Sequence, residues 1–133
     1  RNFNIKNKCY KNVVIFFFYF CSGVWVCGHS AGAHLASLLL HYKPVVEHLL
    51  FQGVILICGL YDLDPLLDTS YNDALRLDRE KAQEISPVNR GLCDNRVKIL
   101  IVTAEFDSPA FNQQSKTYFE VRNFLLHYIF YYI

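Results

Sequence analysis

The sequence predicts an α/β fold in which a parallel sheet is flanked by helices, and two observations support this prediction. Three short apolar runs, Val24–Cys27, Gly53–Cys58 and Lys98–Thr103, are continuous rather than alternating, as is typical of strands covered on both faces. Helix-forming segments separate the runs, so each connection is long enough for the crossover that parallel strands require. Three strands make a thin sheet for such a fold, and we therefore expect part of the domain to be missing.

The helix-forming segments have recognisable boundaries. The first, Ala33–Tyr42, is rich in Ala, Leu and His and is terminated by Pro44. The short helices that follow the second strand are closed by Ser86-Pro87, because a residue before proline avoids the helical conformation. The other expected elements are a loop or short helix at Asp62–Asp68, short polar helices at Tyr71–Leu77 and Arg79–Glu84, and a helix at Ala110–Leu126 with an apolar face of Phe111, Tyr118, Val121 and Leu125.

The bulk composition is that of a globular domain. The chain has 133 residues, of which 53% are hydrophobic, and its formal net charge is +1. This composition excludes a disordered chain, and the charge gives no reason to expect a nucleic-acid partner. Because the sequence contains no Met and begins with Arg1, we expect it to be a fragment of a longer protein.

The cysteines are odd in number and widely spaced, at positions 9, 21, 27, 58 and 93. A zinc site needs closely spaced thiolate or imidazole ligands, and this spacing offers none, so we expect no metal. Cys27 and Cys58 lie within apolar runs. We interpret them as buried free thiols in a reducing cytosol.

The N-terminal segment has the outline of a signal peptide. Basic residues precede the apolar run Val13–Phe20, and small residues follow it at Ser22-Gly23. The run is shorter than the roughly 20 apolar residues that a transmembrane helix needs, so we expect no membrane partner. A cleaved signal peptide stays an alternative.

The motif that carries chemistry is Gly28-His29-Ser30-Ala31-Gly32, which matches G-x-S-x-G. It follows a buried strand and opens a helix of small residues, the setting of a nucleophile elbow. Glycines on both sides let the strand and helix approach closely, and the turn lifts the Ser30 hydroxyl clear of the sheet. We predict Ser30 as the nucleophile and the Ala31 N–H as an oxyanion donor. The alternative is that Ser30 only caps the helix.

A serine nucleophile needs an orienting acid, which in this layout follows the nucleophile along the chain. Asp107 stands just past the strand Lys98–Thr103, where catalytic groups gather, and we predict it as the acid. Its alternative role is that of a turn residue before Ser108-Pro109. Asp62 and Glu105 are rivals for the acid.

None of the five histidines stands where the general base is expected. His29 lies within the elbow, and His34, His41 and His48 lie on or after the first helix. His127 follows Asp107 but falls near the end of a helix, before any further strand. We therefore assign no base.

Four segments resemble the kynurenine formamidase branch of the α/β-hydrolases. The elbow segment Gly28–Ala36 (G-H-S-A-G-A-H-L-A) is similar to that of the family, and Gly59–Leu66 (G-L-Y-D-L-D-P-L) resembles the segment after its next strand. Tyr71–Pro87 is similar to the family's small-helix insert, including the closing Ser-Pro. Glu105–Ser115 (E-F-D-S-P-A-F-N-Q-Q-S) resembles the segment with the family's catalytic acid. The resemblance covers about Gly23 to Val121.

The resemblance implies a partial α/β-hydrolase fold and a serine hydrolase that cleaves N-formyl-L-kynurenine to L-kynurenine and formate in tryptophan breakdown. Ser30 would attack the formyl carbonyl, and Asp107 would orient the histidine that moves the proton. The family implies no metal or organic cofactor, a small formamide substrate, a cytoplasmic location and a homodimer.

Both ends of the chain depart from the family. An upstream H-G-G loop and a downstream histidine motif, which would complete the oxyanion hole and the triad, are not found. We therefore divide the chain into a non-family segment 1–22, a partial hydrolase domain 23–121 and a non-family segment 122–133, and we expect a truncated or mis-spliced product of low solubility and little activity. The alternatives are a carboxylesterase of the same superfamily and a non-catalytic remnant.

Overall fold

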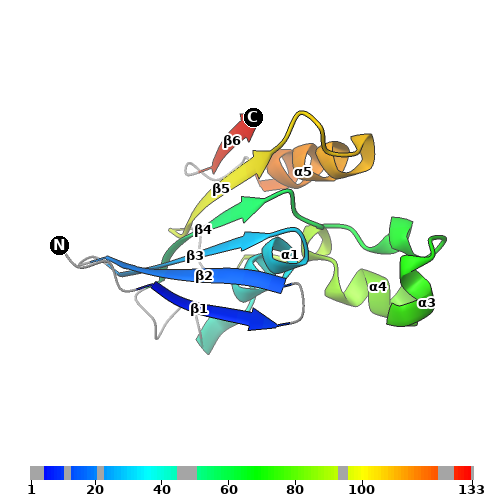
Figure 1. The fold of residues 1–133 in the computed structure, drawn as a ribbon, viewed down its shortest axis with the longest axis horizontal. Coiled ribbons are helices and arrows are strands. Elements are labelled where there is room, and N and C mark those ends of the chain that lie inside the picture. Colours follow the sequence, from blue (N-terminus) through cyan, green and yellow to red (C-terminus); the bar gives the residue numbers. More distant parts are fainter. Residues whose placement is uncertain are drawn as a thin grey trace.

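The computed structural model describes residues 5–10, 13–20, 23–44, 51–92, 96–122 and 128–132. Within these residues, six strands form one sheet in the order β1-β2-β3-β4-β5-β6 (Figure 1). The strands are β1 (Ile5–Tyr10), β2 (Val13–Phe20), β3 (Gly23–His29), β4 (Phe51–Ile57), β5 (Lys98–Thr103) and β6 (Tyr128–Tyr132).

The middle of the sheet confirms the predicted parallel α/β architecture. Strand β3 pairs in parallel with β4, β4 with β5, and β5 with β6, so their carboxyl ends meet at one edge. The three predicted strands correspond to β3, β4 and β5. Strand β4 ends at Ile57, one residue before the predicted end at Cys58. Cys58 has a positive φ of 48°, which is not an extended conformation.

The sheet is wider than the three strands that the sequence indicated. Strands β1 and β2 form an antiparallel hairpin, and β2 continues antiparallel to β3. The apolar run Val13–Phe20, which has the outline of a signal peptide, is strand β2. These two strands and β6 come from the segments 1–22 and 122–133. The division of the chain at those boundaries stays a prediction.

The helices begin close to the positions that the sequence indicated. The first ends earlier than expected, at Leu39, and the predicted end of the last helix, residues 123–126, lies outside the described residues. They are α1 (Ala31–Leu39), the 3₁₀ turn η1 (Asp64–Leu66), α3 (Tyr71–Leu75), α4 (Arg79–Ile85), the 3₁₀ turn η2 (Pro87–Asn89) and α5 (Pro109–Arg122). Helix α1 packs against β2, β3 and β4, and α5 packs against β5 and β6. The short helices α3 and α4 form an insert that projects beyond the sheet (Figure 1).

The apolar face expected for the last helix is confirmed at Tyr118 but wrong at Val121. Helix α5 buries Ser115, Tyr118 and Arg122, whereas Val121 is 47% exposed. Arg122 is buried because its guanidinium donates a hydrogen bond to the backbone carbonyl of Pro87 at 2.7 Å. Phe111 is half-buried, and Leu125 lies outside the described residues.

One core joins the sheet to both long helices. It contains side chains from β3, β4 and β5, together with Ala33 and Ala36 of α1 and Tyr118 of α5. The ring of Tyr61 stacks on that of Tyr118 with centroids 4.3 Å apart, so the loop after β4 is packed against α5. Residues that alternate with the core positions, such as Ile55 and Val102, are half-buried. Among the described residues, the face opposite this core is therefore covered less completely.

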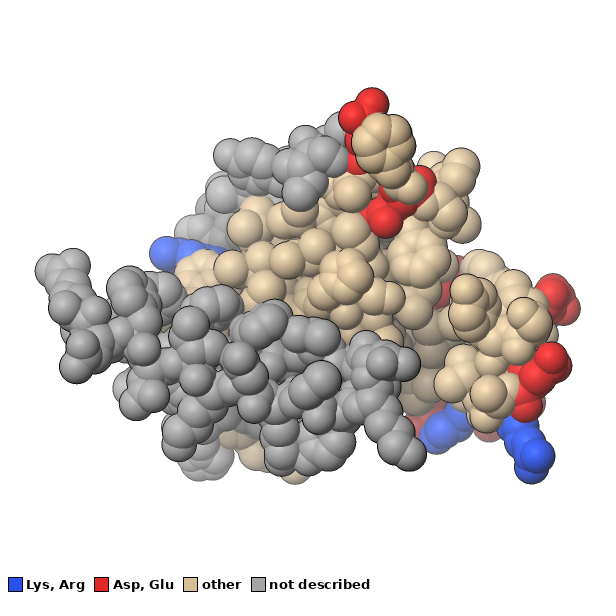
Figure 2. Space-filling view, viewed as in Figure 1, with Lys and Arg blue, Asp and Glu red and all other residues tan. Residues whose placement is uncertain are grey.

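Charged side chains avoid the middle of the sheet. Among the described central strands β3, β4 and β5, Lys98 is charged and stands exposed at the start of β5, and on the face in Figure 2 acidic side chains gather around the loop after β5 and on the insert. Within the described residues, no helix is both long and apolar enough to cross a membrane.

Candidate active site

Ser30 occupies a strained turn between β3 and α1. Its backbone has φ 54° and ψ −119°, a conformation that costs free energy in a residue other than glycine. Its carbonyl accepts hydrogen bonds from the N–H groups of Ala33 and His34, so it stands at the N-cap position of α1. The Ser30 side chain, however, makes no capping hydrogen bond. The strain is therefore not explained by a capping role, and the hydroxyl is left for another use.

The turn requires glycine at position 28, where no side chain is tolerated. A Cβ added to Gly28 would lie 2.2 Å from the carbonyl oxygen of Gly32 and 2.7 Å from the backbone nitrogen of Ala33. The close approach of strand and helix that was expected from the sequence is thus present. The N–H of Ala31 lies in the first turn of α1, where backbone N–H groups have no intrahelical acceptor. Its role as an oxyanion donor stays a prediction.

Asp107 lies in the loop that connects β5 to α5. Its carboxylate accepts a hydrogen bond from the backbone N–H of Ala104 at 3.2 Å, and its own N–H donates to the Ala104 carbonyl at 3.1 Å. The side chain is half-buried. Asp107 is therefore a turn residue, as the alternative held, but its carboxylate is fixed at the carboxyl edge of the sheet.

Ser30 and Asp107 are brought to the same edge by the parallel pairing of three strands. The N–H of Ser30 donates to the carbonyl of Ile57 in β4 at 2.9 Å. One residue later, the N–H of Cys58 donates to the carbonyl of Val102 in β5 at 2.8 Å. The elbow and the acid loop thus follow the first and third of three adjacent strands, with Cys58 between them.

The rival acids are placed differently. The Asp62 carboxylate accepts a hydrogen bond from the N–H of Asp64 at 3.1 Å, the pattern of an Asx turn. Glu105 is exposed. The geometry favours Asp107 over both, although its catalytic role stays a prediction.

The histidines of the described residues are engaged elsewhere. The Nδ1–H groups of His34 and His41 donate to the backbone carbonyls of Leu60 and Gly91, at 3.0 Å and 2.5 Å. Burial lowers the pKa of both imidazoles, so both are held neutral. His29 is exposed at the end of β3. No hydrogen bond in the described part of the chain links an imidazole to Ser30 or Asp107, and His48 and His127 lie outside it.

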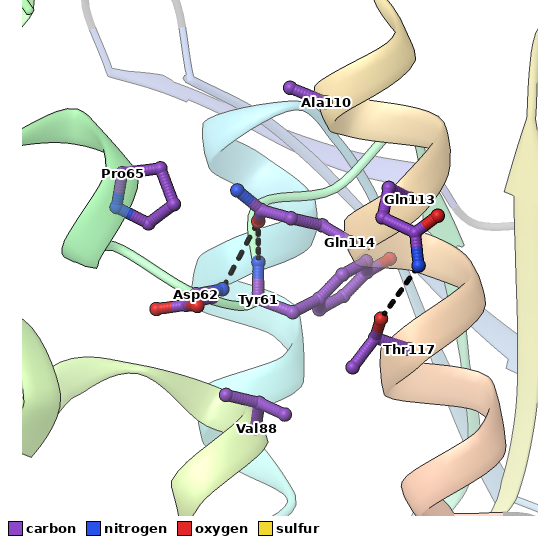
Figure 3. Close-up of a pocket in the computed structure, with 8 residues that line it drawn as sticks. All are labelled: Tyr61, Asp62, Pro65, Val88, Ala110, Gln113, Gln114 and Thr117. Atoms are coloured by element: carbon purple, nitrogen blue, oxygen red, sulfur yellow. Dashed lines mark hydrogen bonds between the residues drawn. The ribbon is translucent and has the colours of Figure 1, made fainter.

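A pocket of about 300 Å³ lies between the loop after β4 and α5 (Figure 3). The side-chain oxygen of Gln114 accepts hydrogen bonds from the N–H groups of Tyr61 and Asp62, at 2.9 Å and 3.1 Å, and closes one side of it. Neither Ser30 nor Asp107 lines this pocket. No sequence motif indicated this pocket, because Tyr61 and Gln114, which meet in it, are 53 positions apart. Its lining is Tyr61, Asp62, Pro65, Val88, Ala110, Gln113, Gln114 and Thr117.

The described residues contain no group of three or more His, Cys, Asp or Glu side chains that could hold a metal ion. Cys27 and Cys58 are free and buried, as expected.

A strained serine between a parallel strand and a helix, with an acid after a strand of the same sheet, defines an α/β-hydrolase. No family model matches the sequence. A solved structure supports the class: the chain superposes on a Silicibacter protein, provisionally described as a thioesterase, with a TM-score of 0.69 and 29% identity. That match covers 80% of this chain and 40% of the other.

Within this class the chain is homologous to kynurenine formamidase. It is 37% identical to the kynurenine formamidase of Danio rerio over 109 residues, and 36% identical to that of Salmo salar over 108 residues. It is also 33% identical to the Drosophila melanogaster protein over 110 residues. These matches cover 74%, 74% and 75% of this chain. The chain spans only 36% to 37% of the length of these relatives.

Proposed function

We propose that Ser30 and Asp107 are the nucleophile and the orienting acid of a serine hydrolase that cleaves N-formyl-L-kynurenine to L-kynurenine and formate. The observation that carries this proposal is the backbone of Ser30, which is strained and leaves its hydroxyl without a capping bond. The homology to kynurenine formamidases supports the formamide substrate. A cytoplasmic location and a homodimer belong to the same proposal.

In this reaction the Ser30 oxygen attacks the formyl carbon while a general base takes the hydroxyl proton. The carbonyl oxygen becomes an oxyanion, which the Ala31 N–H stabilises at the N-terminus of α1. The C–N bond then breaks, and the proton passes to the arylamine leaving group. Water hydrolyses the formyl ester on Ser30 and releases formate. Asp107 orients the base and stabilises its charged form.

The general base is the open part of the proposal, because the described residues bring no imidazole to Ser30. The test therefore supplies one: imidazole is added to the buffer, and the chain is treated with a fluorophosphonate probe. We expect the wild type to be labelled at Ser30 and Ser30→Ala to be unlabelled. Ser37→Ala is the matched control, since Ser37 is a buried serine of the same helix whose hydroxyl donates to the His34 carbonyl at 2.7 Å. Equal labelling of Ser30→Ala would contradict the assignment.

Two further outcomes separate the alternatives. Turnover of p-nitrophenyl acetate without release of kynurenine from N-formyl-L-kynurenine would indicate a carboxylesterase. A wild type that is folded but neither labelled nor active with imidazole present would indicate a non-catalytic remnant. The observation that favours the remnant is that His34 and His41 are committed to backbone carbonyls.

A further inference from the structure

The pocket between the loop after β4 and helix α5 has no part in the proposed catalysis. Its volume is about 300 Å³, at the lower end of the size range of small-molecule sites. It lies at the carboxyl edge of the parallel strands, because Tyr61 follows the last residue of β4 by four positions and Ala110 follows Asp107 by three. Ligands of open α/β folds bind outside this edge. The pocket is therefore placed where a ligand is expected, although Ser30 does not line it.

Most of the pocket wall is apolar, as is typical of small-molecule sites. The buried ring of Tyr61 forms one side and is held by its stack on Tyr118. Pro65, Val88 and Ala110 add aliphatic surface from three separate segments (Figure 3). Pro65 and Ala110 are exposed, so the pocket opens to solvent beside them. A ligand of this pocket therefore has an apolar body.

Gln114 presents a hydrogen-bond donor to the pocket. Its side-chain oxygen accepts the N–H groups of Tyr61 and Asp62, at 2.9 Å and 3.1 Å, and these two donors fix the orientation of the amide. The –NH2 group faces away from that backbone, and Figure 3 shows it on the side where Pro65 lies. No hydrogen bond within the described residues uses this –NH2 group. An acceptor oxygen on a ligand would satisfy it.

Asp62 supplies the charge of the pocket. Its Oδ1 accepts the N–H of Asp64 at 3.1 Å, and its Oδ2 accepts no hydrogen bond in the described part of the chain. The nearby cation Arg79 pairs with Asp64 instead, at 3.8 Å. Because Asp62 also donates its own N–H to Gln114, its carboxylate and the Gln114 –NH2 group lie beside the same peptide group. A ligand that meets both carries a positive charge and an acceptor oxygen a few atoms apart.

We propose that this pocket binds a small primary amine with an apolar body and a carbonyl oxygen next to the ammonium group, which is the chemistry of an amino-acid amide. The ammonium group pairs with Asp62, the carbonyl oxygen accepts from Gln114, and the apolar body packs beside Tyr61. A free amino acid binds less well, because its carboxylate lies close to that of Asp62. The site is independent of the proposed hydrolase function, since neither Ser30 nor Asp107 lines it.

The first experiment tests the ligand chemistry by isothermal titration calorimetry. The probe is L-phenylalaninamide at pH 6, where its amine is protonated. N-acetyl-L-phenylalaninamide lacks the charge, and L-phenylalanine replaces the amide by a carboxylate. We expect saturable binding of the probe, and about tenfold weaker binding of both other compounds. Equal affinity for the acetylated compound, or no saturable binding of the probe to the folded wild type, would overturn the proposal.

The second experiment tests the charge of Asp62. Asp62→Asn keeps an oxygen for the N–H of Asp64 but removes the negative charge. We expect its affinity for L-phenylalaninamide to fall about tenfold, to the level of the acetylated compound in the wild type. Asp68→Asn is the matched control, since Asp68 is an exposed acid of the same segment that does not line the pocket. An equal loss in both variants would show only a general attraction of cations to this segment, against the proposal.

The third experiment tests the location. Ala110 is exposed and lines the pocket, so Ala110→Leu adds volume to the pocket without disturbing the core. We expect the variant to lose binding of L-phenylalaninamide while its urea midpoint stays that of the wild type. Ala74→Leu, at an exposed alanine of helix α3 outside the pocket, is the matched control and should bind normally. Normal binding by a folded Ala110→Leu would place the ligand elsewhere and overturn the proposal.

Discussion

The elbow around Ser30 and the acid side around Asp107 lie at neighbouring strand ends but are built in opposite ways. The elbow is shaped by a missing side chain, because only a glycine at position 28 lets the backbone of Gly32 come so close. The acid side is shaped by polar side chains that satisfy backbone groups across long sequence distances, as Gln114 and Arg122 do. A local motif can therefore specify the first, whereas the second needs the whole fold.

The largest loss of stability is expected from a substitution that disrupts the elbow. Gly28→Ala places a Cβ 2.2 Å from a backbone oxygen, which cannot move without displacing α1, so the free energy of unfolding should fall by about 3 kcal/mol or more. Urea denaturation measures the change. Gly91→Ala, whose Cβ would meet nothing within 4 Å, should stay within about 0.5 kcal/mol of the wild type. Similar losses in both variants would show that the elbow is not sterically determined.

A smaller loss of stability is expected from a substitution that removes a buried polar side chain of the acid side. Arg122 is 7% exposed, and its guanidinium donates to the carbonyls of Pro87 and Arg90. Arg122→Met keeps much of the packing against Tyr118 but removes these charged donors, so we expect a loss of about 2–3 kcal/mol by urea denaturation. Arg79→Met, at a side chain 73% exposed and 3.8 Å from Asp64, should cost about 0.5 kcal/mol or less. If Arg122→Met has the same free energy of unfolding as the wild type, the hydrogen bonds of the Arg122 guanidinium do not stabilise the fold.

His34 tests the link between the two regions, because it belongs to the elbow helix and donates to Leu60 on the acid side. Burial lowers its folded pKa below the usual 6.5, so the unfolded chain binds the proton more readily in acid. The stability from this group is present above pH 6.5 and is lost as the pH falls through the folded pKa. Relative to the wild type, His34→Gln should lose about 1 kcal/mol at pH 7 and less at pH 5. Parallel stability curves for the two proteins between pH 7 and 5 would refute this.

The smallest effect is expected at Cys58 and only in alkali. Its folded pKa of about 11 lies above the 9.0 of an unperturbed thiol, so its contribution is fully present below pH 9 and is lost as the pH rises toward 11. The wild type should therefore lose stability more steeply than Cys58→Ala between pH 9 and 11. The pKa of Tyr118 is also raised by burial and acts equally in both proteins, whereas the pKa of Tyr61 is raised by burial and by the charges of Tyr118 and Cys58, so its titration adds to the difference. Thermal unfolding at closely spaced pH values measures the difference in slope.

Features that depend on neighbours along the chain could be predicted from the order of the amino acids. Continuous apolar runs located β3, β4 and β5, and the pattern of glycines around Ser30 located the elbow. The position of Asp107 directly after a strand was enough to place it at the same edge of the sheet as Ser30, since the carboxyl ends of parallel strands share one edge.

Contacts between groups far apart in the sequence became visible only in the folded chain. The buried face of α5 could not be predicted, because Arg122 is inside to satisfy carbonyls more than 30 positions away. The N–H of Cys58 meets the carbonyl of Val102 because β4 and β5 lie side by side, although 44 positions separate the two residues in the sequence. Hydrophobic periodicity reports burial averaged over a segment, whereas a buried polar contact depends on which donor and acceptor the packing brings together.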